Sequence, residues 1–225
     1  MIGGETMENN KGFKVMTICA LVAAVVGLSL GFAAFSNTLT ISSSAEVTPS
    51  SDTFKVYFSS SDEGVVTEKI GAVDAGTVAG ATGDEATITN EASDGTNKIE
   101  GLNAKFTKPG QKVTYSFYVH NIGEYPAYLK SLSVTSAPTV CQKTADSEAS
   151  ADLVSGACAG ISMSVKLNET EYTTSTTAFT TNRVLAVNGM IPVVVTIDYA
   201  STASPVDGPI EVEFDGIELK YSSAQ

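Results

Sequence analysis

The amino-acid sequence predicts an all-β protein, an antiparallel β-sandwich of jelly-roll or immunoglobulin-like type that follows an N-terminal signal or transmembrane helix. Residues 113–120 alternate apolar and polar side chains, which is typical of a strand with one buried and one solvated face. Beyond the N-terminus the apolar residues come in short runs at this spacing, without a helical period. Because every sheet face needs a cover, the alternating strands predict two sheets packed on each other.

The N-terminal part of the chain carries an export signal or an anchor. Residues 15–35 are uncharged and follow a short basic stretch. A run of this length is longer than an ordinary signal-peptide core and just long enough to span a bilayer as a helix. A cleaved signal peptide with its hydrophobic helix at 15–33 and a retained membrane anchor are therefore both compatible with it.

The end of the apolar run favours cleavage. Gly31 and Ala33 are small residues at the −3 and −1 positions of a processing site. The sequence thus predicts a signal peptide over 1–33, a cut between Ala33 and Ala34, and a single β-sandwich domain over 34–225.

Cleavage there would free an amphipathic strand at 34–41. Phe35, Leu39 and Ile41 share one face of this strand, and serines at 42–44 form a flexible tether behind it. Such a strand can pair within its own domain, or it can be donated to the open sheet edge of a neighbouring subunit. The residues alone leave both alternatives open.

The clearest strands lie between residues 101 and 134. A proline-glycine turn at 108–111 precedes the alternating strand, and a second turn at 121–124 leads into a return strand at 128–134. We expect three strands joined by short turns to form an antiparallel meander, which needs a second sheet to cover it.

Two stretches resemble the TasA/camelysin family of secreted biofilm proteins of Gram-positive bacteria. They are GLNAKFTKPGQKVTYSFYVHNIGEYPAYLKSLSV at 101–134 and the junction GFAAFSNTLTI at 31–41, which FKVYF follows at 54–58. The resemblance implies processing by a SipW-like signal peptidase and export to the extracellular matrix or cell surface. It also implies a homopolymeric fibre in which the N-terminal strand enters the next subunit, with other matrix proteins as further partners. It does not extend over 59–97.

The chain is strongly acidic, with a formal net charge of −12. This charge excludes a nucleic-acid partner, because phosphates require clustered lysine and arginine. Many of the carboxylates lie in a long excursion at 59–97, where no D-x-D-x-D-G spacing indicates a calcium loop. We interpret this excursion as solvated acidic loop with short strands at 64–70 and 86–89, and we assign no cofactor or metal.

Cys141 and Cys158 flank a polar loop. In an exported protein, an otherwise isolated pair of cysteines predicts a disulfide. Neither cysteine has a basic or histidine neighbour in sequence that would lower a thiol pKa, so a reactive thiol lacks support.

The C-terminal part of the chain predicts further strands at 161–167, 171–179, 190–199 and 210–221. The apolar phase of the last segment slips by one residue at Asp215–Gly216. An Asp-Gly pair fits either a tight hairpin or a bulge in one long strand, and the resemblance favours the bulge.

Enzymatic chemistry has little support in the sequence, and we predict no catalytic residues. The camelysin name is associated with metallopeptidase activity, but His120 is the only histidine, so no multi-histidine zinc site can form. We interpret His120 as a hydrated or hydrogen-bonded histidine at a sheet edge. Glu211 and Glu213 share one strand face, which is more typical of solvated charge than of a glycosidase pair.

The predicted function is therefore a non-enzymatic structural subunit that assembles by donor-strand exchange. The alternative is a monomeric cell-surface module that an uncleaved N-terminal helix holds in the membrane and that binds glycan or protein. A glycan-binding surface would need several tyrosines exposed together on one sheet.

Overall fold

The structure, a computed structural model, describes residues 53–62, 66, 68–91, 96–145, 147–179 and 183–223. The chain divides into two compact units, Met1–Val47 and Thr48–Gln225, and every described residue belongs to the second. The predicted signal helix, the cleavage site and the strand at 34–41 lie outside the described residues. No helix within the described ranges is long and apolar enough to cross a bilayer.

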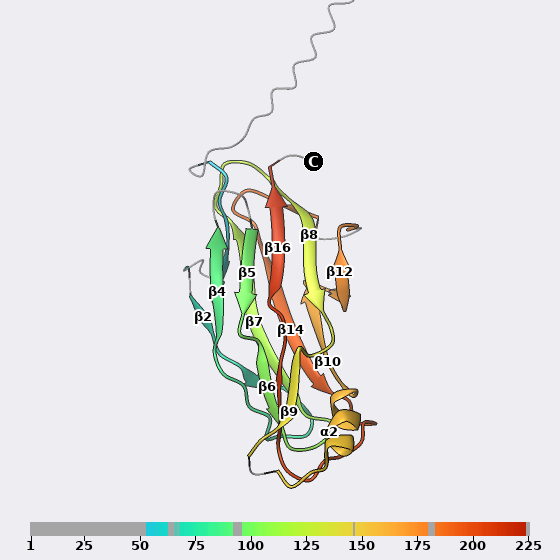
Figure 1. Ribbon diagram of the computed structural model, residues 1–225. Coiled ribbons are helices and arrows are strands. Elements are labelled where there is room, and N and C mark those ends of the chain that lie inside the picture. The colour runs from blue at the N-terminus through green and yellow to red at the C-terminus, as the bar shows by residue number, and fades with distance from the viewer. Residues whose placement is uncertain are drawn as a thin grey trace, which may run out of the picture. The chain divides into compact units, whose positions relative to one another are not determined.

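The second unit is built almost entirely from antiparallel strands, which confirms the all-β prediction (Figure 1). One layer is a sheet in the order β1-β7-β14-β10-β11, and β3 also pairs with β7. Its strands are β1 (Val56–Ser59), β3 (Val73–Asp74), β7 (Lys112–Asn121), β10 (Ile161–Leu167), β11 (Thr170–Tyr172) and β14 (Met190–Tyr199).

β7 and β14 form the centre of this sheet. They pair in unbroken register from Met190 opposite His120 to Asp198 opposite Lys112. Alternate side chains of both strands are almost completely buried, as the two-residue period predicts. These side chains are Val113, Tyr115, Phe117 and Val119 of β7, and Val193, Val195, Ile197 and Tyr199 of β14. The predicted strands at 113–120, 161–167 and 190–199 are therefore confirmed.

The facing strands belong to two further sheets. One has the order β12-β8-β16-β5-β4-β2 with β13 also paired to β8, and the other has the order β6-β15-β9. Their strands are β2 (Lys69–Ile70), β4 (Ala86–Glu91), β5 (Thr96–Glu100), β6 (Asn103–Phe106), β8 (Ala127–Thr135), β9 (Val140–Lys143), β12 (Thr174–Thr176), β13 (Val184–Leu185), β15 (Ile210–Glu213) and β16 (Ile217–Ser222).

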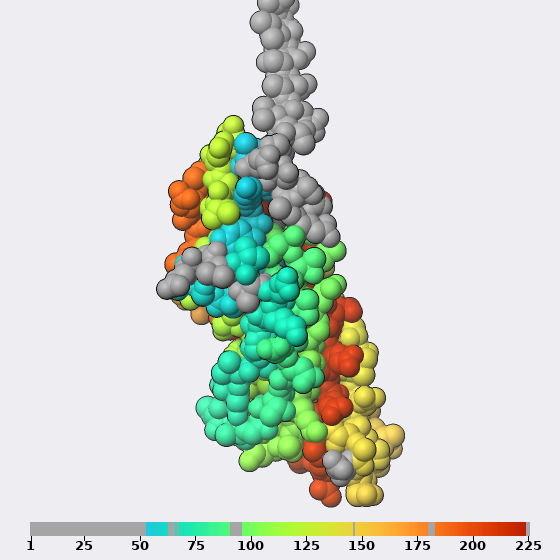
Figure 2. All heavy atoms as spheres, turned by 90° about the vertical axis from the view of Figure 1, so that its left-hand side faces the viewer, coloured from blue at the N-terminus to red at the C-terminus, as the bar shows by residue number. Residues whose placement is uncertain are grey.

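The three-stranded sheet continues the larger one along the chain. β5 leads into β6, β8 into β9 and β15 into β16, and the continuing strands keep the same neighbours. Figure 1 shows β6 and β9 beyond the ends of β5 and β8. Figure 2 shows the yellow atoms of the β9 region beside the red atoms of the C-terminal strands. The two sheets thus lie one after the other.

The junction between them lies where two neighbouring strands break together. Gly101, at a φ of +76°, and Leu102 separate β5 from β6. The Phe214 N–H donates to the Leu102 carbonyl at 2.9 Å, which joins the two breaks. A Cβ on Gly216 would lie 2.6 Å from the Ile99 carbonyl oxygen, so this backbone approach requires glycine. The segment at 210–221 is therefore two strands in successive sheets, neither a hairpin nor one bulged strand.

The predicted meander is wrong, because β6, β7 and β8 lie in three different sheets. The connection at 107–111 crosses between layers and is held by the buried Gln111 side chain. Gln111 Oε1 accepts from the Thr107 and Lys108 N–H groups at 2.6 and 3.1 Å, and Nε2 donates to the Ala79 carbonyl at 2.9 Å. A proline-glycine turn signal marks the reversal but does not say which sheet the next strand joins.

The strand expected at 171–179 is also divided. β11 pairs with β10 in the first sheet, and β12 pairs with β8 in the facing layer. The chain therefore changes layers at Thr173, between the two short strands. The chain turns between β10 and β11, with Asn168 in a left-handed conformation at a φ of 52°.

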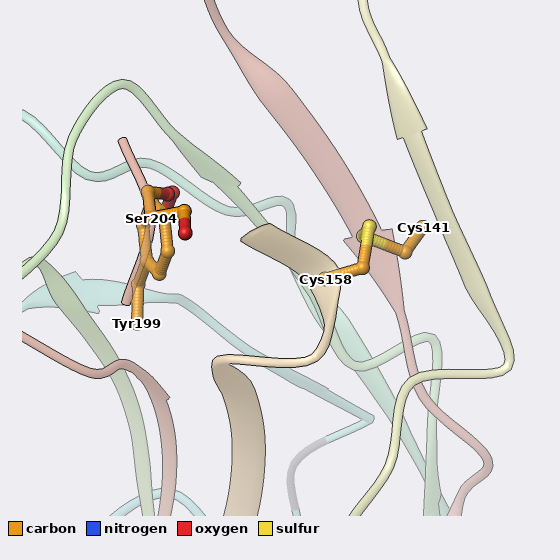
Figure 3. Close-up of a disulfide and its surroundings, with 4 residues drawn as sticks. All are labelled: Cys141, Cys158, Tyr199 and Ser204. Carbon is orange, nitrogen blue, oxygen red and sulfur yellow. A yellow bond between two sulfur atoms is a disulfide. The ribbon is translucent and has the colours of Figure 1, made fainter. Parts of the chain in front are cut away.

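The disulfide between Cys141 and Cys158 is confirmed, with a Cα–Cα distance of 6.0 Å (Figure 3). The sequence did not predict the short helix α2 (Ala151–Cys158) that carries Cys158. Val154 and Ala157 of this helix are buried. Nearby, the Tyr199 hydroxyl donates to the Ser204 carbonyl at 2.6 Å, an arrangement that fixes the loop after β14.

We expect the two bonded cysteines to resist alkylation until a reductant is added, as intact mass would show for the secreted protein. Cys19 is the only other cysteine, so a chain that keeps its leader would gain one alkyl group and a processed chain none. Replacing both bonded cysteines by serine should lower the free energy of unfolding by about 3 kcal/mol, because the bond closes a 17-residue separation. That variant should unfold identically with and without reductant; two free thiols in the processed wild type would contradict the assignment.

Candidate assembly surface

One edge of the sandwich is closed by a side chain. The Phe58 N–H of β1 donates to Asn90 Oδ1 at 2.7 Å, and Asn90 Nδ2 donates back to the Phe58 carbonyl at 3.4 Å. The amide of Asn90, on β4 in the facing layer, therefore takes the place of a neighbouring strand at Phe58. Because edge strands with free N–H and C=O groups recruit other strands, this contact blocks β1 at that position.

The sequence contains a signal for this contact, although we did not predict the contact from it. Ala86, Ile88 and Asn90 occupy the same face of β4, and the first two are buried. An amide at the third position of an otherwise apolar face indicates a polar group that needs partners inside the protein.

The opposite edge, along β8, is covered much less firmly. Among the described residues, only β12, of three residues, and β13, of two, pair with its outer side. Both strands are partly or largely exposed, and the β12 register is irregular. Figure 1 shows β12 as a short strand at the side of the longer β8.

Within this cover, side chains and loops replace regular ladder bonds. The Ser175 hydroxyl accepts from the Val134 N–H at 2.9 Å and donates to the Val134 carbonyl at 3.1 Å. Further along, the Leu129 N–H donates to the Arg183 carbonyl at 2.7 Å. A hollow of about 270 Å³ lies between these contacts, lined by Leu129, Lys130, Thr177, Ala178, Phe179 and Arg183. The outer side of β8 is thus loosely covered.

His120 lies inside the sheet and not at its edge, which corrects the sequence interpretation. β7 has β1 on one side and β14 on the other, so His120 pairs with both Tyr57 and Met190. Its imidazole stacks on the Tyr57 ring with centroids 5.5 Å apart, and Nε2 lies 3.2 Å from the Ser61 carbonyl. The side chain is only 7% exposed, and these contacts hold its ring in place.

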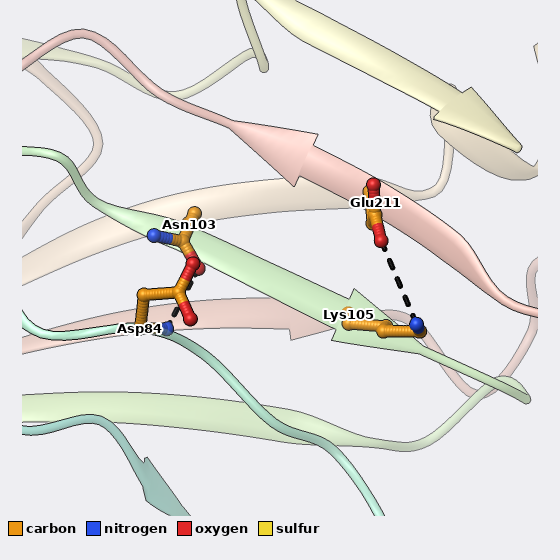
Figure 4. A network of polar contacts seen from close by, with 4 residues as sticks. All are labelled: Asp84, Asn103, Lys105 and Glu211. Carbon is orange, nitrogen blue, oxygen red and sulfur yellow. Dashed lines mark hydrogen bonds and ion pairs between the residues drawn. The ribbon is translucent and has the colours of Figure 1, made fainter. Parts of the chain in front are cut away.

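An acidic groove of about 720 Å³ follows the junction between the two successive sheets. The Lys105 ammonium lies 3.5 Å from Glu211, and the Asp84 N–H donates to Asn103 Oδ1 at 2.9 Å (Figure 4). The carboxylates that line the groove belong to Asp84, Glu100, Glu211, Glu213 and Asp215. Across the described ranges, no group of three or more His, Cys, Asp or Glu side chains could hold a metal ion.

The floor of this groove is held by the buried hydroxyl of Tyr115. It lies 2.8 Å from the Asn103 carbonyl and 3.1 Å from the Asp84 carbonyl, and it accepts from the Asn103 N–H at 3.3 Å. Burial raises the pKa of the hydroxyl, the Asn103 backbone opposes this rise, and the Asp84 charge adds to it. Tyr115 therefore stays neutral and ties two loops together, so it serves the fold.

The tyrosines are not exposed together on one sheet. Tyr57 and Tyr115 are buried, Tyr118 and Tyr128 are half-buried, and only Tyr125 of this group is exposed. The part of the chain that is described therefore lacks the group of exposed tyrosines that a glycan-binding surface would need.

The structure brings together the predicted disulfide pair, whereas the predicted cleavage and donor residues, Ala33, Ala34, Phe35, Leu39 and Ile41, lie outside the described residues. No family model, curated protein or solved structure matches this chain.

Replacing Asn90 by alanine tests the closed edge. Because Phe58 is fully buried, its N–H and carbonyl groups would lose their partner without gaining water. We expect the free energy of unfolding in urea to fall by about 1–3 kcal/mol. Thr89→Ala is the matched control, since Thr89 is exposed on the other face of β4; equal losses for the two variants would refute the role of Asn90.

Proposed function

We propose that this chain is an exported structural subunit of an extracellular fibre or matrix, related to the TasA/camelysin family, and that it assembles by donating its N-terminal strand. In this proposal residues 15–33 are the signal helix, and the sandwich is of jelly-roll or immunoglobulin-like type. The strand at 34–41 leaves its own subunit after processing. No catalytic role is assigned.

The observation that carries the proposal is the difference between the two edges of the sandwich. The β1 edge is blocked at Phe58 by Asn90, whereas β12 and β13 are the only described strands that cover β8, and both are short. Strand addition needs an edge whose backbone groups can be offered to an incoming strand at little cost. β8 meets this requirement, because displacing β12 and β13 gives up few regular ladder bonds.

The geometry suggests how the donated strand would be held. An incoming strand along β8 would pair with the backbone groups that Ser175 and Arg183 now satisfy. Phe35, Leu39 and Ile41, on one face of the donor, would pack against the hollow beside Leu129. Main-chain bonds would supply affinity, and the pockets for alternate side chains would set the register.

The N-terminal residue and the assembly state of the released protein test this proposal. Cells of a Gram-positive host that carries a SipW-like peptidase would express the full chain, and the released fraction would be examined by mass spectrometry and electron microscopy. We expect filaments of chains that begin at Ala34, and we expect filaments to disappear when 34–41 is deleted.

Two results would count against the proposal. A membrane-bound chain that keeps residues 15–35 and forms no filaments would favour the anchored binding module. Filaments that persist without 34–41 would exclude strand donation. A deletion of the same length at 42–49, which removes the serine tether and the five residues after it and keeps the donor strand, is the control for a general effect of shortening the N-terminus.

Assembly should also depend on salt. With a formal net charge of −12, copies repel one another. Because the screening length falls from about 30 Å at 0.01 M salt to about 8 Å at 0.15 M, we expect filament growth, followed by light scattering, to speed up over this range. Mild acid should act in the same direction by neutralising carboxylates. Unfolding midpoints in the same buffers serve as the control, and growth rates independent of both salt and acid would contradict this expectation.

A further inference from the structure

Residues 174–179 lie along the outer side of β8, in the place that the proposed donor strand would take. They begin with β12, which pairs with β8, and they end at Phe179. We call these six residues the strap. Because one side of a strand can form a ladder with only one neighbour at a time, the strap and a donated strand exclude each other along β8.

The backbone of the strap holds β8 at few points. The register between the two strands is irregular between Thr174 and Thr176. At this irregularity the Ser175 hydroxyl replaces the backbone, since it accepts from the Val134 N–H at 2.9 Å and donates to the Val134 carbonyl at 3.1 Å. All three residues of β12 are partly or largely exposed. The pairing of β12 with β8 is therefore short and accessible to water.

Immediately after β12 the strap turns. The Thr176 hydroxyl accepts from the Ala178 N–H at 3.0 Å and donates to the Ala178 carbonyl at 3.3 Å. A threonine hydroxyl that bonds the backbone two residues further on forms a local turn, which competes with strand pairing. The strap thus limits its own ladder with β8 to the three residues of β12.

An aromatic side chain anchors the end of the strap. Phe179 is partly buried against the hydrophobic core, and its ring meets the Tyr172 ring edge-on with centroids 6.0 Å apart. Phe179 also lines the hollow of about 270 Å³ beside Leu129. In the proposed function this hollow receives apolar side chains of the donor strand. The anchor of the strap therefore lies at the acceptor position itself.

We propose that the strap is an autoinhibitory element that covers the acceptor strand β8 until a donated strand displaces it. Phe179 keeps the strap closed from the hollow, and the short pairing of β12 allows it to leave. This inference rests on the proposed function and adds its regulation. Release of the strap, and not the encounter between subunits alone, limits the rate at which filaments begin.

A reversible crosslink tests whether the strap must leave. Thr135 and Thr174 are directly opposite each other, and both are exposed. Opposite residues of antiparallel strands have Cα atoms about 4.5–5.5 Å apart, a separation that a disulfide can bridge. The secreted product of the full chain would carry Thr135→Cys with Thr174→Cys, and light scattering would follow its assembly. We expect no filament growth while the crosslink is intact and growth after reduction.

Two controls accompany this crosslink. Ser164→Cys with Thr196→Cys joins opposite residues of β10 and β14 within the first sheet, away from the strap, and should leave growth unchanged. Wild type in the same reductant accounts for the loss of the native disulfide between Cys141 and Cys158. Urea unfolding establishes that each crosslinked variant is folded.

Phe179→Ala tests the opposite direction. Because the strap loses its anchor, we expect the lag before filament growth to shorten about threefold or more, in line with a lower barrier to release. Tyr125→Ala is the matched control, since Tyr125 is an exposed aromatic residue in the β7–β8 loop, and its replacement should leave the lag unchanged.

The outcomes separate the strap from the donor strand. Filaments that grow equally well with the strap crosslinked would overturn the inference, and strand donation would still stand if those filaments require residues 34–41. A lag that Phe179→Ala leaves unchanged or lengthens would also overturn the inference. A wild type that forms no filaments at any concentration would refute both the strap and the proposed function.

Discussion

The ladder between β7 and β14 is the constraint on which the remaining structure depends. Both strands present an unbroken row of buried side chains, and each contributes to the layer that covers the facing sheets. β1 and β3 pair with the outer side of β7, and β10 pairs with the outer side of β14. The two ends of β7 also fix the crossings between layers, because Gln111 before it and Asn121 at its end are buried amides that satisfy loop backbone groups. A buried polar group without partners is costly, so these amides hold each crossing in one conformation.

At both the β1 edge and the β8 edge, a polar side chain bonds backbone groups in place of a strand, but the two side chains differ in how firmly they do so. Asn90 offers both a donor and an acceptor to the buried Phe58, and its rigid amide closes β1 from the facing layer. Ser175 offers one hydroxyl to Val134, on a strand of three residues. An amide that bridges two layers is difficult to displace, whereas a short exposed strand costs little to move. The β1 edge is thus closed at Phe58 by an amide that bridges two layers, and β8 is covered by two short strands.

Individual strands were predictable from the sequence, and their partners were not. The period of two in β7, β10 and β14 identifies buried faces, and the bounds of these strands follow from it. The same period is satisfied by any neighbour, so it could not show that β6, β7 and β8 enter different sheets. Helix α2 escaped prediction because it has eight residues and no side-chain cap, and burial of Val154 and Ala157 together with the disulfide at Cys158 holds it in place. Among the residues of the candidate surface, only Asn90 could have been identified from the sequence, because it shares a strand face with two apolar residues. The roles of Ser175 and Asn121 depend on segments distant in sequence.

A comparison of magnitudes indicates why a donated strand alone would bind weakly. Ordering the eight residues at 34–41 costs about 1–2 kcal/mol per residue, and association costs at least about 4 kcal/mol more. Ladder bonds return about 0.5–1.5 kcal/mol each, and Phe35, Leu39 and Ile41 return about 1.5–3 kcal/mol each when fully buried. These terms nearly cancel, and repulsion between acidic copies works against association. Contact outside the strand would therefore favour assembly of the kind proposed.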